Sequence, residues 1–163
     1  MNINMWSGPR NLSTALMRSF ENRNDTCVWD EPLYAFYLKH TKLKHPMANE
    51  IIKLYKTDIK ELIPIMTKKN TNYEINYLKH MTHHLFESTP IDWITKNKNC
   101  LLIRNPAKVI NSYIKKSELN SANDLGFPSQ YRIFNYLKKN HMELIIINAD
   151  DLVSDPKKLL IQL

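Results

Sequence analysis

The stretch from Trp6 to Leu16 constrains the fold of this 163-residue chain more than any other, because it joins a short extended segment directly to a helix. The connection is the tight polar turn Ser7-Gly8-Pro9-Arg10-Asn11, and the helical pattern begins at Leu12. The first N–H groups of a helix have no internal partner and carry the positive end of the helix dipole. A strand, a turn and a helix start in this order therefore predict an anion site.

Three side chains in and just after this turn strengthen the prediction. Ser13 and Thr14 supply hydroxyl donors at the start of the helix. Arg10 supplies a planar guanidinium that suits phosphate or sulfate oxygens. The expected ligand is a nucleotide-like polyanion.

Strand and helix patterns alternate along the rest of the chain. Strands are expected at 2–6, 26–29, 73–78, 99–103 and 143–148, and helices at 12–22, 32–40, 48–63, 82–88, 106–117, 128–140 and 155–163. The apolar runs 101–103 and 144–147 are typical of buried parallel strands. Asn105-Pro106 and Asp155-Pro156 supply an N-cap and a first-turn proline. The pattern predicts an α/β fold, a three-layer α/β/α arrangement around a mainly parallel sheet, with residues 1–163 as a single domain.

Polar residues follow all five predicted strands. They are Ser7 to Arg10, Asp30-Glu31, Lys79 to His84, Arg104-Asn105 and Asn148 to Asp151. Ligands of parallel sheets bind beyond the carboxyl ends of the strands. These five segments are therefore expected to surround one site.

Composition narrows the setting and the partners. The formal net charge is +7, but the basic residues are scattered and no RNA- or DNA-binding motif is present, so a nucleic-acid partner is not expected. No apolar run is long enough for a membrane span, and no secretory pattern opens the chain. Cys27 and Cys100 lie in apolar strand-like runs and are expected to be buried thiols. We expect a cytoplasmic protein.

The sequence lacks the parts of a metal-dependent nucleotide site. Leu12-Ser13-Thr14 stands where a Walker A motif has Gly-Lys-Ser/Thr, and the strand beside it ends in Arg104 instead of a magnesium-binding Asp. His80 and His84 have the spacing of a zinc pair, but no third ligand follows at a recognisable spacing. No metal is expected, and a small-molecule kinase of another P-loop type stays as an alternative.

Several motifs together resemble the sulfotransferase superfamily, which has a P-loop-like fold. Ser7-Gly8-Pro9-Arg10-Asn11-Leu12-Ser13-Thr14 looks like its 5′-phosphosulfate loop. The segment from Leu102 to Tyr113 resembles its 3′-phosphate motif, in which a serine follows an arginine by eight residues, as Ser112 follows Arg104. Met5 to Arg10, Asp30 to Pro32, Lys79 to Leu85 and Asp124 to Pro128 are similar to a family of bacterial-type sulfotransferase-like proteins.

The resemblance implies a sulfotransferase that uses 3′-phosphoadenosine 5′-phosphosulfate as donor and a hydroxyl or amine of a small molecule as acceptor. Residues 7–14 would hold the 5′ side of the donor, with Arg10 also neutralising charge during transfer. Arg104 and Ser112 would hold the 3′-phosphate. Such fixed donors can stabilise the transition state without a metal.

An acceptor hydroxyl also needs a base. Glu31 is the first candidate, because a carboxylate there resembles the base of some sulfotransferases; N-capping is its structural alternative. His83 and His84 are further candidates, since a neutral imidazole accepts protons near pH 7. Lys79 is expected to neutralise the leaving oxygen.

Two departures from the family pattern carry consequences. Leu12 stands where many members have glycine. The family also continues for several tens of residues beyond the position of Leu163, so we expect the domain to be truncated at its C-terminus. An inactive nucleotide-binding or interaction module is therefore a further alternative to the enzyme.

Overall fold

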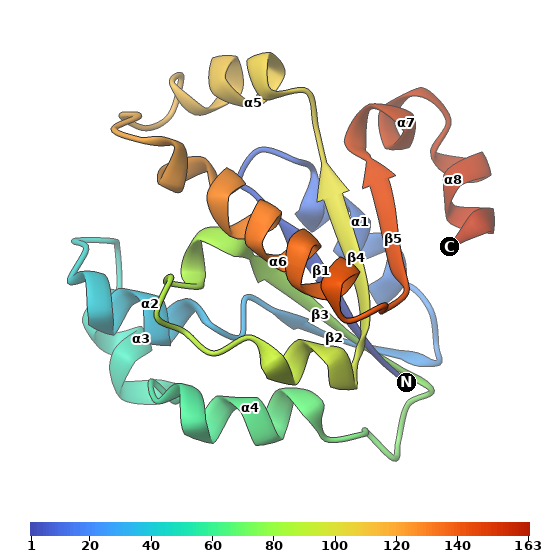
Figure 1. The fold of residues 1–163 in the computed structure, drawn as a ribbon, viewed down its shortest axis with the longest axis horizontal. Coiled ribbons are helices and arrows are strands. Elements are labelled where there is room, and N and C mark those ends of the chain that lie inside the picture. Colours follow the sequence, from blue (N-terminus) through green and yellow to red (C-terminus); the bar gives the residue numbers. More distant parts are fainter.

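The computed structural model describes all 163 residues and contains one five-stranded sheet in the order β2-β3-β1-β4-β5 (Figure 1). The strands are β1 (Asn2–Ser7), β2 (Thr26–Asp30), β3 (Ile75–Met81), β4 (Lys98–Ile103) and β5 (Leu144–Asn148). Every neighbouring pair is parallel. The predicted parallel sheet is therefore confirmed, and all five strands end at one edge.

Helices cover both faces of this sheet. They are α1 (Ser13–Glu21), α2 (Tyr34–Thr41), α3 (Ala48–Leu54), α4 (Ile59–Thr67), α5 (Pro106–Tyr113), α6 (Phe127–Lys139), α7 (Ala149–Ser154) and α8 (Pro156–Gln162). Short 3-10 turns lie at Thr82–His84, Asp92–Lys96 and Ala122–Leu125. No helix is both long and apolar enough to cross a membrane.

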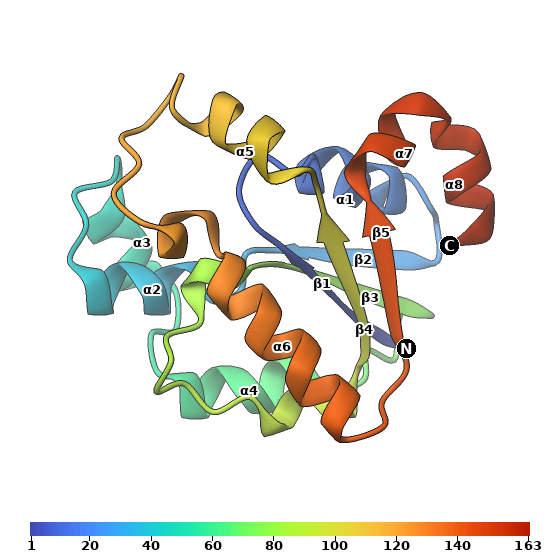
Figure 2. The same ribbon diagram turned by 45° about the horizontal axis from the view of Figure 1, so that its top comes forward.

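The two faces have separate apolar cores, which confirms the three-layer α/β/α class (Figures 1 and 2). On one face, α2, α4 and α6 pack over β1, β3 and β4 around the buried side chains of Trp6, Trp93 and Ile133. On the other face, α1 packs over the same strands, with Leu16, Met17 and α7 as the main contributors.

Three expectations about local structure were wrong. Helix 48–63 is two helices, because Tyr55 is extended and the carboxylate of Asp58 caps a new helix by accepting the N–H of Lys60 at 2.8 Å. Helix 82–88 is only the 3-10 turn Thr82–His84, since Leu85 is extended and buried. Cys27 is only half-buried, because its strand β2 is an edge strand, whereas Cys100 is buried.

Candidate active site at the carboxyl edge of the sheet

The turn after β1 occupies the switch point of the sheet. β1 lies between β3 and β4, and Ser7 pairs in register with Met81 on one side and Leu102 on the other. The chain first builds the β3–β2 half of the sheet and then crosses to β4 and β5. In open parallel sheets, ligands bind in the crevice at such a point.

The start of α1 presents free backbone donors beside the carboxyl end of β1. Leu12 adopts a left-handed conformation (φ 65°) and makes no side-chain cap. No hydrogen bond within the protein engages the N–H groups of Ser13, Thr14 or Ala15. A left-handed residue followed by helical ones also forms a concave nest of N–H groups that suits an anion. The left-handed backbone explains why glycine is common at the position of Leu12 in related loops.

Two predicted donor-binding residues turn their side chains into the protein instead of toward the crevice. The Ser7 hydroxyl donates to the Gly8 carbonyl at 2.7 Å, and the Asn11 amide donates to the Leu102 carbonyl at 3.2 Å. Both side chains are buried. They fix the shape of the turn, while Thr14 at the helix start is exposed.

The turn that contains Gly126 forms a wall against the β1 turn. A Cβ atom on Gly8 would lie 2.4 Å from the carbonyl oxygen of Leu125. A Cβ atom on Gly126, which has φ +72°, would lie 2.3 Å from the hydroxyl of Thr82. That hydroxyl donates to the carbonyls of Ser7 and Gly126. The close contacts require glycine at both positions and join the ends of β1 and β3 to the turn before α6.

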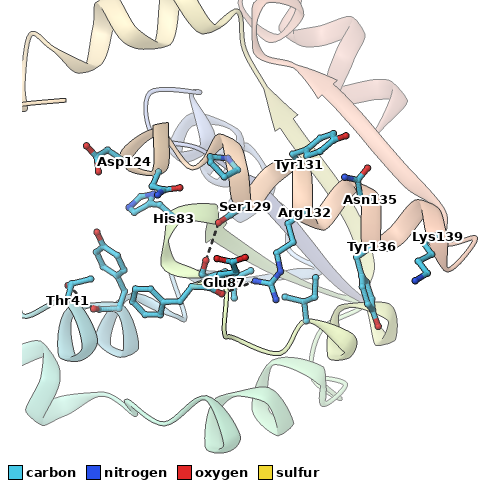
Figure 3. Close-up of a pocket in the computed structure, with 16 residues that line it drawn as sticks. Thr41, His83, Glu87, Asp124, Ser129, Tyr131, Arg132, Asn135, Tyr136 and Lys139 are labelled. Carbon is cyan, nitrogen blue, oxygen red and sulfur yellow. Dashed lines mark hydrogen bonds between the residues drawn. The ribbon is translucent and has the colours of Figure 1, made fainter. Parts of the chain in front are cut away.

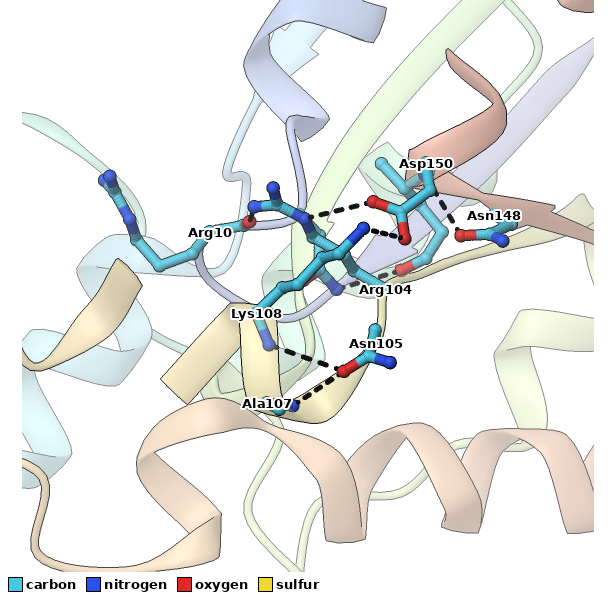
Figure 4. A network of polar contacts seen from close by, with 9 residues as sticks. Arg10, Arg104, Asn105, Ala107, Lys108, Asn148 and Asp150 are labelled. Carbon is cyan, nitrogen blue, oxygen red and sulfur yellow. Dashed lines mark hydrogen bonds and ion pairs between the residues drawn. The ribbon is translucent and has the colours of Figure 1, made fainter. Parts of the chain in front are cut away.

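Arg10, Arg104 and Ser112 converge at this edge although they come from distant parts of the chain. Nε of Arg10 donates to Oγ of Ser112 at 2.9 Å. Nη1 of Arg104 donates to the backbone carbonyl of Arg10 at 2.8 Å (Figure 4). Asn105 caps α5 by accepting the N–H groups of Ala107 and Lys108. The cap fixes where α5 begins after Arg104, and the Arg10–Ser112 hydrogen bond links this helix to the β1 turn.

Sequence reasoning missed two charged residues beside Arg104. Asp150 places Oδ1 3.7 Å from Nε of Arg104 and Oδ2 2.9 Å from Nζ of Lys108 (Figure 4). Asp150 belongs to the polar segment after β5, so its position beyond the carboxyl end of a parallel strand was a signal for it. Lys108 follows Arg104 by four residues, close to one helical turn, which was the available signal.

Lys79 lies between two carboxylates at the exits of β2 and β3. Its buried ammonium donates to Oδ1 of Asp30 at 2.6 Å and to Oε1 of Glu31 at 2.7 Å. Glu31 has φ 51°, and its N–H donates to the carbonyl of Lys79. In this arrangement the ammonium orients Glu31, and Glu31 lines an apolar cavity of about 600 Å³ next to α3 and α4.

His83 lines a different and larger cavity, of about 970 Å³, between α2 and α6 (Figure 3). The same cavity is also lined by Tyr37, Asp124 and Arg132. Burial lowers the pKa of His83 to about 4, although the nearby carboxylate of Asp124 opposes the shift. The imidazole is therefore neutral at physiological pH. The two candidate bases, Glu31 and His83, face separate cavities.

The other two histidines of this segment lie in the interior. His84 is buried and stacks on the rings of Tyr34 and Tyr37, and its pKa is lowered by burial. His80 stacks on Trp6 with ring centroids 4.2 Å apart, and burial lowers its pKa to about 3. Both side chains are therefore packing residues, and neither lines the two cavities that Glu31 and His83 face.

A comparison with protein families agrees with this geometry. A family described as "Sulfotransferase domain" matches residues 1–163. The chain belongs to this family. The sequence-based assignment of the family, and of its α/β fold, is thereby confirmed.

Two curated relatives from Arabidopsis thaliana carry a different name. Branched-chain-amino-acid aminotransferase-like protein 2 and protein 1 are each 32% identical to this chain over 155 residues. The match covers 95% of this chain but only 28% of either relative. The chain thus spans little more than a quarter of the length of these proteins.

Proposed function

We propose that this sulfotransferase-family chain transfers a sulfuryl group from 3′-phosphoadenosine 5′-phosphosulfate to a hydroxyl or amine of a small acceptor. The proposal extends the family assignment to a donor, a class of acceptor and a set of residues. The observation that carries it is that the Arg10 guanidinium contacts Ser112 while the Arg104 guanidinium contacts the backbone carbonyl of Arg10. One nucleotide with anionic groups at both its 5′ and 3′ positions fits a strand-turn-helix anion site that lies next to the basic segment after β4.

The 5′ side of the donor would lie at the start of α1. There the N–H groups of Ser13, Thr14 and Ala15 have no hydrogen-bond partner within the protein. In the transfer, an acceptor oxygen or nitrogen bonds to sulfur while the bridging S–O bond breaks, and the bisphosphate leaves with the electron pair. Negative charge develops on the bridging oxygen, where the helix start and Arg10 stabilise it.

The acceptor proton needs a separate partner, and we propose Glu31. Its carboxylate is oriented by Lys79 and retains oxygen lone pairs that face the cavity beside α3. Lys79 then acts as a positioning residue. To neutralise the leaving oxygen, its ammonium would have to give up its ion pairs with both Asp30 and Glu31. His83 is the alternative base, and its cavity is the one beside α6.

Binding of adenosine 3′,5′-bisphosphate, the product of the donor, tests the assignment of the nucleotide site. Arg10→Ala and Arg104→Ala should each weaken calorimetric affinity about tenfold or more, because each removes hydrogen bonds from a charged donor. Arg23→Ala is the matched control, since Arg23 pairs with Asp25 at the opposite end of α1. Equal affinities of the wild type and both site variants would refute the proposal.

The same titration separates the alternative functions. Tighter binding of magnesium–ATP than of the bisphosphate would favour a small-molecule kinase. Bisphosphate binding without transfer to any acceptor in a metabolite pool would favour an inactive nucleotide-binding module. The aminotransferase part of the relatives' names is not carried over, because the match covers 28% of either relative.

Substitution of the candidate bases tests the second half of the mechanism. Glu31→Gln should lower kcat about a hundredfold or more while bisphosphate affinity stays unchanged, since proton transfer commonly contributes factors of about 10²–10⁴. His83→Gln should leave kcat within a few-fold of the wild type. The opposite pattern would assign the base to His83 and the acceptor to the larger cavity.

A cytoplasmic setting completes the proposal. Both cysteines are free thiols, which fits a reducing compartment. The proposed partner is a small molecule, with no role for nucleic acid or a membrane.

A further inference from the structure

Lys108 and Asp150 form an ion pair at the edge of the proposed 3′-phosphate site. Nζ of Lys108 donates to Oδ2 of Asp150 at 2.9 Å. Lys108 and Ser112 are separated by about one turn of α5, and Arg104 lies just before the helix. Lys108 and Ser112 therefore lie on the same side of α5, and Asp150 brings Lys108 next to Arg104.

Asp150 also accompanies Arg104, so a single carboxylate bridges two cations. Its Oδ1 lies 3.7 Å from Nε of Arg104, and that buried Nε has no hydrogen-bond partner. The backbone of Asp150 is held in place, because its N–H donates to the side-chain oxygen of the N-cap residue Asn148 at 3.0 Å. The Asp150 carboxylate bridges Arg104 and Lys108 in the way that a bound phosphate group would (Figure 4).

The balance of charge favours the replacement of the Asp150 carboxylate by a phosphate group. A phosphate monoester carries a charge of about −1.5 to −2 near pH 7. Together with the Asp150 carboxylate, the phosphate carries a negative charge close in size to the positive charge of Arg10, Arg104 and Lys108. Arg104 is also anchored at the carbonyl of Arg10, so it keeps its position when the carboxylate is displaced. The Lys108 side chain is more than half exposed, and its flexible stem lets the ammonium turn from Asp150 to an incoming phosphate.

We propose that Lys108 is a third group of the 3′-phosphate site, and that Asp150 occupies the two cations until the phosphate replaces it. This inference rests on the proposed function. It assigns to Lys108 the discrimination between a 3′,5′-bisphosphate and a nucleotide that lacks the 3′-phosphate. Asp150 is a positioning residue that competes with the ligand.

The test is the ratio of affinities for adenosine 3′,5′-bisphosphate and 5′-AMP, measured by calorimetry on the full chain. Lys108→Ala should reduce this ratio about tenfold by weakening bisphosphate binding, with AMP affinity nearly unchanged. Lys108→Arg should retain most of the ratio. Lys115→Ala is the matched control, because Lys115 is exposed just beyond the end of α5 and carries the same charge.

Asp150→Asn provides an independent arm. It removes the negative charge but keeps an oxygen acceptor, so bisphosphate affinity should rise about three- to tenfold, and AMP affinity should not change. A weakened bisphosphate affinity in this variant would overturn the placeholder role. An unchanged ratio in Lys108→Ala, with a wild type that prefers the bisphosphate, would overturn the role of Lys108 alone. A wild type without that preference would refute the proposed function as well.

Discussion

At the scale of single residues, the segment after β3 shows how burial assigns different roles to neighbouring histidines. His80 and His84 fill the interior, whereas His83 reaches a cavity. Burial lowers the pKa of all three, so the folded protein holds them neutral below the pH at which free histidine gains its proton. Their contribution to stability therefore depends on pH.

This arrangement predicts acid sensitivity with a definite sign. Below about pH 6.5 the unfolded chain binds protons at these histidines that the folded chain does not, so the free energy of unfolding falls as pH falls from about 6.5 toward 4. Each histidine contributes a slope of about 1.4 kcal/mol per pH unit within that window. Denaturant unfolding at several pH values measures the slope.

Two variants make the measurement specific. His83→Gln should reduce the slope by one proton, because the pKa of His83 in the folded protein is about 4. His141→Gln is the control, since His141 is exposed at the turn after α6, away from this segment. A stability that is flat between pH 6.5 and 4 in the wild type would contradict the buried placement of this segment.

At the scale of elements, α5 connects helix stability to the proposed nucleotide site. Its N-cap Asn105 lies between Arg104 and the helix that carries Lys108 and Ser112. α4 has a similar cap, Asp58, but contributes no residue to the β1 turn. The two caps therefore allow stability and binding to be separated.

Asn105→Ala and Asp58→Ala should each destabilise the protein by about 1 kcal/mol, the usual cost of losing an N-cap. Only Asn105→Ala should also weaken bisphosphate binding, by several-fold, because α5 loses its fixed start. Thermal unfolding and calorimetric titration of both variants measure the two effects. Equal affinities in the two variants would show that α5 does not position the ligand groups.

At the scale of the whole molecule, the sheet has an open edge at β5. This strand pairs only with β4, and the side chains of Ile145 and Ile146 are 44% and 50% exposed. An exposed apolar edge strand can pair with another chain, and natural edges are usually protected by charge. The fold thus predicts self-association through β5 at high protein concentration.

Ile146→Lys should suppress that association, because a lysine on the edge disfavours pairing with a second strand. Its free energy of unfolding should stay within about 0.5 kcal/mol of the wild type, as for most exposed sites. Leu54→Lys is the control, since Leu54 is exposed on α3, away from this edge. Light scattering across a concentration series decides; equal association of the wild type and Ile146→Lys would contradict the prediction.

Much of the architecture could be read from the sequence because its signals are local. The run Leu101-Leu102-Ile103 predicted a buried strand and Asn105-Pro106 a helix start, and the structure has both. Where long-range contacts compete with a local pattern, the predictions failed. The segment after β3 looks helical, but Thr82 is tied to Ser7 and His84 is packed on α2, so only a 3-10 turn forms.

The sequence by itself determined the strand-turn-helix around Arg10 and the order of the polar strand exits, because periodicity, caps and glycines act over a few residues. Only the tertiary structure decided which exits meet. In the folded chain Ser112 contacts Arg10, and Asp150 pairs with Lys108. Lys79 pairs with Asp30 and Glu31. Glu31 and His83 line separate cavities. Those pairings depend on strand order and helix packing, which join residues far apart in the chain.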